Sequence, residues 1–194
     1  MEEPNSDGLV AFDDWKQGNN TEQIKSIEDG LRQSLKEQSE RLGKPIVFEK
    51  WRVYPTLDEN RKILYYATDI RWDGDLSTTI KATTFDRRGY VTFQIMPVRT
   101  DLGSSEIENV MLDMTSHYQP STNEGYSSFV SGDKVAAVGA VGVLAALLGV
   151  KYTKVAATTF FAIALVFLKK LWFLLLIPFV ALKKLFSRKS GDEA

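Results

Sequence analysis

Apolar residues recur at helical spacing near the start of the chain. Placed on a helix over residues 21–42, they form one narrow stripe, made of Ile24, Ile27, Leu31, Leu35 and Leu42. Asn20 precedes the stripe as a capping residue, and Gly43 follows it as a stop signal. The same spacing predicts a second helix at 105–117, with an inward face of Ile107, Val110, Met111 and Met114.

The chain between these two helices has the pattern of β-strands. Four runs rich in β-branched and aromatic residues predict strands at 46–54, 63–72, 76–85 and 90–96. Asp73-Gly74 is a tight-turn signal, and the other connections are also too short for parallel crossovers. We therefore predict an α+β domain over 21–118, a small antiparallel four-stranded meander flanked by two helices that form one layer.

Two polar segments flank this predicted domain. Residues 1–20 are acidic and contain no apolar run of the length that a secretory signal needs, so we interpret them as a flexible lead-in. Residues 119–133 are polar and predict a connector.

The connector leads to sixteen uncharged residues, 135–150. As a helix they would span about 24 Å, which is short against a hydrocarbon core of about 30 Å. Flanking residues extend the segment, and we predict a transmembrane helix at 134–152; a buried core helix is the alternative. The small residues Gly139, Gly142 and Gly149 would let such a helix pack closely against another in lipid.

Residues 153–189 predict a second membrane element, followed by a polar end at 190–194. On a single helix the basic residues fall within an arc of roughly 160°, and they are Lys151, Lys154, Lys169, Lys170, Lys183, Lys184 and Arg188. Such a helix could lie in the interface with its lysines on anionic headgroups. Alternatively, residues 155–182 could span the bilayer, although two lysines at its centre would cost about 5–7 kcal/mol.

The distribution of charge also divides the chain between residues 133 and 134, where the predicted membrane segments begin. Residues 1–133 contain 23 acidic and 15 basic side chains, whereas residues 134–194 contain 2 and 9. The net charge of -1 over all 194 residues is therefore a cancellation between an acidic domain and a basic, apolar tail. We expect Lys134 and the lysines after it to contact anionic lipid, and we expect no binding of nucleic acid.

Residues for common catalytic chemistry are scarce. The chain has no cysteine and one histidine, His117, which falls at the expected end of the second helix and suits a helix C-terminus. We find no motif for a cofactor or a metal ion and expect a protein that is not an enzyme. An enzyme that uses carboxylates and the aromatic surface of the sheet remains a third hypothesis.

Several segments resemble a known family, the uncharacterised bacterial proteins described as predicted membrane-anchored, or domain of unknown function 2167. The resemblance runs through residues 8–14, the 22–42 helix pattern, Trp51, residues 63–67, 87–91 and 131–139. It implies an envelope protein with a soluble domain and a C-terminal anchor, and it implies no reaction. Family members usually have a further N-terminal region behind a signal peptide, so we expect a fragment or a shortened member.

Our leading hypothesis is a non-enzymatic binding or scaffold module anchored in the bacterial inner membrane. Its domain would lie outside the cytoplasm, with Lys151 and all later residues inside, and its partner would be a second copy or another envelope protein. A two-crossing hairpin with a cytoplasmic domain is the other topology. The alternative function is an oligomeric pore or membrane-remodelling element, assembled through Gly139, Gly142, Lys169 and Lys170.

Overall fold

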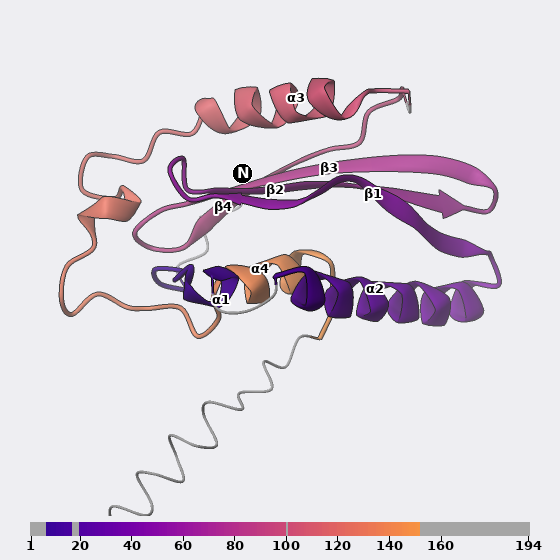
Figure 1. Ribbon diagram of the computed structural model, residues 1–194, viewed down its shortest axis with the longest axis horizontal. Helices are drawn as coiled ribbons and strands as arrows, with labels where there is room; N and C mark the ends of the chain where they lie inside the picture. The colour runs from indigo at the N-terminus through magenta and orange to yellow at the C-terminus, as the bar shows by residue number, and fades with distance from the viewer. Residues whose placement is uncertain (1–6, 17–19, 100, 152–194) are drawn as a thin grey trace, which may run out of the picture. The chain divides into compact units, whose positions relative to one another are not determined.

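A computed structural model describes residues 7–16, 20–99 and 101–151. In chain order these form α1 (Asp13–Lys16), α2 (Asn20–Leu42), β1 (Ile46–Asp58), β2 (Ile63–Trp72), β3 (Asp75–Phe85), β4 (Tyr90–Ile95), α3 (Ser104–Ser116), the 3-10 turn η1 (Tyr126–Ser128) and α4 (Ala140–Leu147). The strands form one antiparallel sheet in the order β1-β2-β3-β4 (Figure 1). The predicted α+β class and the four-stranded meander are therefore confirmed. The predicted tail at 153–194 lies outside the described residues.

The turns confirm the hairpin prediction, but β1 is longer than predicted. Asp73 and Gly74 both have positive φ, 49° and 96°, as the tight turn between β2 and β3 requires. Pro55 does not end β1, which continues to Asp58. Because β1 is an edge strand with a register shift between Val53 and Thr56, a residue without an N–H is tolerated there.

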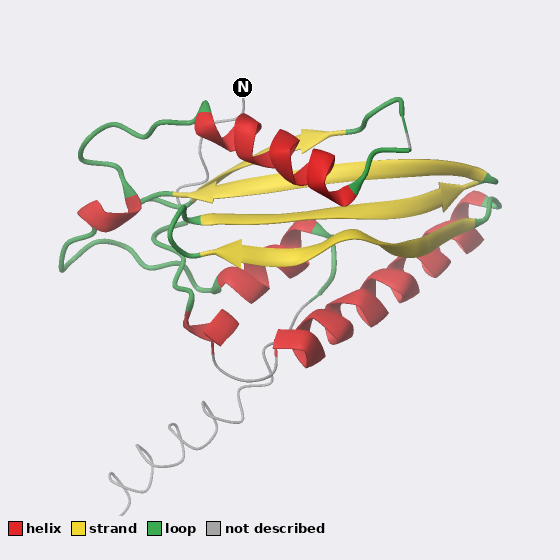
Figure 2. Ribbon diagram, turned by 45° about the horizontal axis from the view of Figure 1, so that its top comes forward, coloured by secondary structure: helices red, strands yellow, loops and turns green. Residues whose placement is uncertain are grey.

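Helices cover both faces of the sheet, so the prediction of a single helical layer is wrong. Figures 1 and 2 show α3 on one face and α1, α2 and α4 on the other. Beneath α3, Ile107 and Met111 are buried against Ile80 and Ala82. On the opposite face four members of the predicted stripe of α2 are buried, but Leu42 at its end is 54% exposed.

Residues 7–16 belong to the domain and are not the flexible part of a lead-in. Val10, Phe12 and Trp15 are buried, and the Phe12 ring stacks on Tyr126 with centroids 4.9 Å apart. The Tyr126 hydroxyl donates to the Val10 carbonyl at 2.7 Å. The predicted connector at 119–133 therefore also packs onto the domain, because it supplies Tyr126.

The prediction of a transmembrane helix at 134–152 is wrong for the residues that the structure describes, which reach 151. Its only helical part, α4, has eight residues, and Ala140–Ala145 are buried in the domain core. At 1.5 Å per residue, α4 is about 12 Å long, far short of a bilayer. No helix in the described ranges is long and apolar enough to cross a membrane. Six of the eight residues of α4 are buried, so most of this helix needs no polar side chains, just as a helix in lipid needs none.

Two glycines allow the α4 segment to approach its neighbours closely. A Cβ on Gly30 of α2 would lie 2.6 Å from Val150, and a Cβ on Gly139 would lie 2.4 Å from the Asp14 carboxylate. Gly30 therefore makes room for the chain that follows α4. The described chain ends at Lys151, directly after that contact.

Candidate functional site

Three segments that are far apart in the sequence meet beside the turn between β3 and β4. The Gly8 N–H donates to the Arg88 carbonyl at 2.7 Å, and the Leu9 N–H donates to the Lys134 carbonyl at 2.9 Å. Leu9 and Val135 also form a parallel bridge. These contacts join residues 8–14, 87–91 and 131–139, three of the segments on which the family resemblance is based.

A hollow of about 310 Å³ opens at this junction, and we call it the basic hollow. It is lined by Gly8, Arg87, Arg88, Asp133 and Lys134. Gly8 has a φ of 105°, and a Cβ there would lie 2.6 Å from the Lys134 carbonyl oxygen. Only glycine therefore lets the first segment approach so closely.

The arginines of the basic hollow bind carboxylates of the same junction. Arg87 grips Asp133 with two hydrogen bonds, of 2.7 and 2.8 Å, and donates to the Asn123 carbonyl at 3.0 Å. These bonds, together with one from the Val130 N–H, lower the pKa of Asp133 to about 2. Arg88 donates to Glu124 at 2.6 Å.

This pairing decides what the basic hollow can do. Arg87, Arg88 and Lys134 outnumber Asp133 and Glu124 by one positive charge, so most of the positive charge of the basic hollow is balanced within the junction. Two-point arginine–carboxylate bonds give strong, directional attachment. The arrangement therefore acts mainly as a clamp that holds the chain before α4 against the β3–β4 turn.

A buried carboxylate supports the turn itself. Asp86 accepts hydrogen bonds from the N–H groups of Arg88 and Gly89, at 2.7 and 2.8 Å. The Tyr118 hydroxyl donates to its second oxygen at 2.6 Å. Burial, reinforced by this bond to a carboxylate, raises the pKa of Tyr118 to about 12. The hydroxyl stays protonated in the physiological range and acts as a fixed donor.

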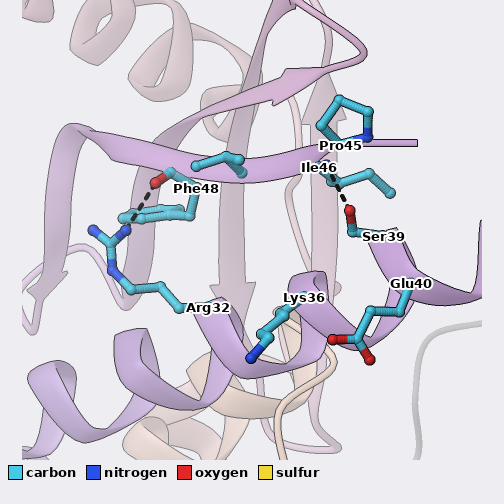
Figure 3. A pocket seen from close by; sticks show the side chains of 8 residues that line it. Arg32, Lys36, Ser39, Glu40, Pro45, Ile46 and Phe48 are labelled. Atoms are coloured by element: carbon cyan, nitrogen blue, oxygen red, sulfur yellow. Dashed lines mark hydrogen bonds between the residues drawn. The ribbon is translucent and has the colours of Figure 1, made fainter. Parts of the chain in front are cut away.

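A second hollow, the α2–β1 groove, lies between the end of α2 and the start of β1 (Figure 3). It encloses about 420 Å³, has an apolar wall of Pro45, Ile46, Val47 and Phe48, and has a charged rim that includes Lys36 and Glu40. Arg32 closes one end, because it donates to the Phe48 carbonyl at 2.8 Å and lies 4.6 Å above the Phe48 ring. The groove could hold a small apolar group, but nothing in its geometry selects one.

A lysine ties α4 to the sheet. Lys81 of β3 donates to the Leu147 carbonyl at the end of α4, at 2.7 Å. A cation there also interacts favourably with the helix dipole. Burial lowers the pKa of Lys81.

The sequence analysis missed this lysine, because its partner is a backbone carbonyl 66 residues away. It also missed the buried pair of Arg52 and Asp69, 2.7 Å apart, in which Asp69 further accepts from Thr78 at 2.8 Å. Side chains alternate along β2, so Asp69 shares a covered face of the sheet with Ala67. This alternation was the sequence signal from which a buried, paired Asp69 could have been predicted.

The predicted lipid-contact and packing residues are partly described. Lys134 and Lys151 are exposed, and the Lys134 carbonyl binds Leu9. Gly139 meets Asp14, Gly142 is buried in α4, and Gly149 follows the helix with a φ of 68°. All three glycines therefore pack or turn within the domain. The other predicted lipid-contact residues lie outside the described residues, and they are Lys154, Lys169, Lys170, Lys183, Lys184 and Arg188.

His117 is the C-cap of α3, as predicted. Within the described ranges, no three His, Cys, Asp or Glu side chains are placed to hold a metal ion.

Comparison with known proteins identifies one family. A family model described as "Protein of unknown function (DUF2167)" matches residues 3–180. No curated protein matches the chain significantly. No solved structure does so either.

Proposed function

The chain belongs to the DUF2167 family, and from that premise we propose that it is a non-enzymatic module whose folded domain is held at a lipid bilayer by the segment after residue 151. The family description states no activity, so the support comes from the chain itself. We place the module at the bacterial inner membrane.

One observation carries the proposal: a long stretch with few charges begins a few residues after the folded domain. Residues 155–182 number 28 and contain only two charges, Lys169 and Lys170. A helix of that length would measure about 42 Å, more than the hydrocarbon thickness of about 30 Å. The family match extends past the domain to residue 180, so it includes most of this stretch.

The place of α4 simplifies the proposed topology. Both topologies expected from the sequence, the two-crossing hairpin and the single crossing with Lys151 inside, used residues 134–152 as a crossing, but α4 lies in the domain core. One membrane element then remains, either spanning or lying in the interface. We favour the interfacial or partly inserted arrangement, because Lys169 and Lys170 would otherwise lie near the bilayer centre at a cost of about 5–7 kcal/mol.

We propose binding instead of catalysis because the charged side chains of the basic hollow form ion pairs with one another. Arg87 and Arg88 are engaged by Asp133 and Glu124, which leaves a rigid clamp. Such a clamp fixes the surface of the domain, and its paired charges are not available for proton transfer to a substrate.

Vesicle flotation tests the anchoring. The full chain should float with vesicles of anionic lipid and should float less with purely zwitterionic vesicles. A chain that ends at Lys151 should stay at the bottom of the gradient. Flotation of the shortened chain would contradict the proposal, because it would place the anchor within residues 1–151.

A matched pair of full-length variants separates charge from apolar contact. Replacing Lys169 and Lys170 by glutamate should weaken the preference for anionic vesicles, because headgroup attraction is worth about 1 kcal/mol per lysine. Replacing Lys25 and Lys36, on the exposed face of α2, should leave flotation unchanged. Equal effects of the two pairs would show non-specific electrostatic binding and would contradict the assigned role of the tail.

A pore or membrane-remodelling element remains the second candidate. Gly139 and Gly142 no longer favour it, because both are placed inside the domain. It now depends on Lys169 and Lys170 alone, and release of a trapped dye from vesicles by the full chain would support it.

A further inference from the structure

The two edges of the sheet differ in how they are protected. Edge strand β1 has register shifts at three places, contains Pro55 and several charged side chains, and is contacted by Arg32 at the Phe48 carbonyl. Edge strand β4, of sequence YVTFQI, contains no charge and no proline, and its register with β3 is unbroken. Proteins commonly guard edge strands with the devices that β1 has and β4 lacks.

The face of β4 on the α3 side presents apolar side chains that the domain does not cover. Val91, Phe93 and Ile95 share this face, because they stand opposite Thr84, Ala82 and Ile80 of β3. All three are partly exposed, and within the described residues Val91 and Phe93 do not pack against the buried apolar core. The main contacts of α3 are with β1, β2 and β3.

The apolar surface continues beyond the end of the strand. Met96 and Val98 are 64% and 102% exposed, the two highest values among the large hydrophobic side chains that the structure describes. On the other face of β4, Thr92 and Gln94 are exposed and polar. Among the residues that the structure describes, the strand therefore has an apolar face, a polar face and an edge that pairs with no other strand.

We propose that β4 is a self-association surface, where two copies of this chain join antiparallel strands into one continuous sheet. A two-fold axis at Phe93 places Phe93 opposite its own copy, Val91 opposite Ile95, and Thr92 opposite Gln94. Apolar residues then meet apolar residues on one face, and polar residues meet polar residues on the other.

The absence of charge favours a second copy as the occupant. A two-fold interface sets the residue on the axis opposite its own copy and keeps its neighbours close to their copies, so a charge in the middle of β4 would lie near a like charge. Between Tyr90 and Ile95 there is none. A two-fold axis at Thr92 instead would place Ile95 opposite Gly89 and leave one apolar side chain unmatched, so the axis at Phe93 pairs the strand better.

A strand pair of this length buries less than the roughly 800 Å² per partner of a standard interface. Confinement of both copies to one membrane raises their effective concentration and offsets the small area. This last point rests on the proposed anchoring, whereas the pairing of residues does not.

Crosslinking in vesicles tests the register directly, because the native chain has no cysteine. The full chain with Phe93→Cys should form a disulfide-linked dimer under mild oxidation, since two-fold pairing sets the two thiols opposite each other. The matched control is Val47→Cys, an exposed position on the guarded edge, which should stay monomeric. Flotation of the same sample reports anchoring independently, so failure of either idea can be recognised.

A second experiment uses the unchanged full chain as the reference and compares it with lysine variants. By sedimentation in detergent, the full chain should dimerise, and Phe93→Lys should raise the dissociation constant at least tenfold while Val47→Lys leaves it unchanged. Gln94→Lys, at an exposed position, should weaken the dimer without affecting the fold. A monomeric wild-type chain, or association that neither Phe93→Lys nor Gln94→Lys reduces, would overturn the proposal, and so would equal crosslinking at positions 47 and 93.

Discussion

Residues 135–150 and 155–182 resemble each other in sequence and differ in what surrounds them. Both are apolar, and both are followed by lysine. The first contains α4, most of which is buried against α1, α2 and the core residues of the sheet. The second follows the end of the described domain, and we propose lipid as its surroundings. An apolar segment therefore does not reveal by composition whether protein or lipid covers it.

Length and small residues are the features that separate the two segments. The first has sixteen residues and three glycines, whereas the second has 28 residues, no glycine and six phenylalanine or tryptophan side chains. Glycine at 139 allows contact with Asp14, as close packing in a protein core requires. Large aromatic side chains suit a lipid surface, where no fixed neighbour limits their size.

The largest expected effect comes from a charge placed in each segment. Val143→Asp buries a carboxylate in the domain core, where Val143 is fully buried, and should destabilise the domain by more than about 4 kcal/mol. Leu165→Asp in the tail should leave the thermal transition of the domain unchanged and should weaken flotation. Thermal denaturation, followed by circular dichroism, measures the stability of both variants, and flotation measures their binding to vesicles. Equal effects of the two variants on both measurements would contradict the assignment of different surroundings to the two segments.

A smaller effect is expected where α1 meets α4. Gly139→Ala introduces a Cβ that would lie 2.4 Å from the Asp14 carboxylate, so one of the two helices must shift, at a cost of about 1–3 kcal/mol. Ala146→Ser, at an exposed position on α4, is the control and should be neutral. Urea denaturation measures both, and an unperturbed Gly139→Ala would mean that the contact is not tight.

Lys81 should contribute about 1 kcal/mol through its bond to Leu147. Because burial lowers its pKa in the folded state, the unfolded chain binds more protons in the window just below pH 10.5. Stability from this group therefore rises with pH through that window. Lys81→Met should lower stability and remove the rise, and urea midpoints at a series of pH values would show whether it does.

The smallest effect concerns the clamp at the basic hollow. The pKa of Asp133 is about 2 in the folded domain, below its usual value in an unfolded chain of about 3.9. Its contribution is therefore complete above about pH 4 and is lost as the pH falls toward 2. Asp133→Asn should flatten the acid limb of the stability profile, while Asp101→Asn, at an exposed position, should change it less.

Local patterns predicted the sheet and the two long helices well, and long-range contacts account for the errors. The stripe of α2 and the Asp73-Gly74 turn are determined by neighbouring residues, which the sequence displays. The burial of Phe12 depends on Tyr126, more than a hundred residues away, and no local pattern shows such a contact. For the same reason α4 was interpreted as a membrane helix.

The basic hollow was equally beyond prediction as a site. Arg87 and Asp133 are 46 residues apart, and each alone is an ordinary surface charge. The family resemblance marked the three segments that meet there without showing that they touch.

The most direct test of the account compares Ala146 in α4 with Phe167 in the tail in one vesicle-bound protein. A spin label at each position, introduced through a single cysteine, reports whether a water-soluble relaxing agent or dissolved oxygen reaches it more readily. Ala146 is on the exposed surface of α4, so its label should respond to the water-soluble agent, and the label at position 167 should respond to oxygen. A lipid-like response at position 146 would contradict the account, because it would place α4 in the membrane.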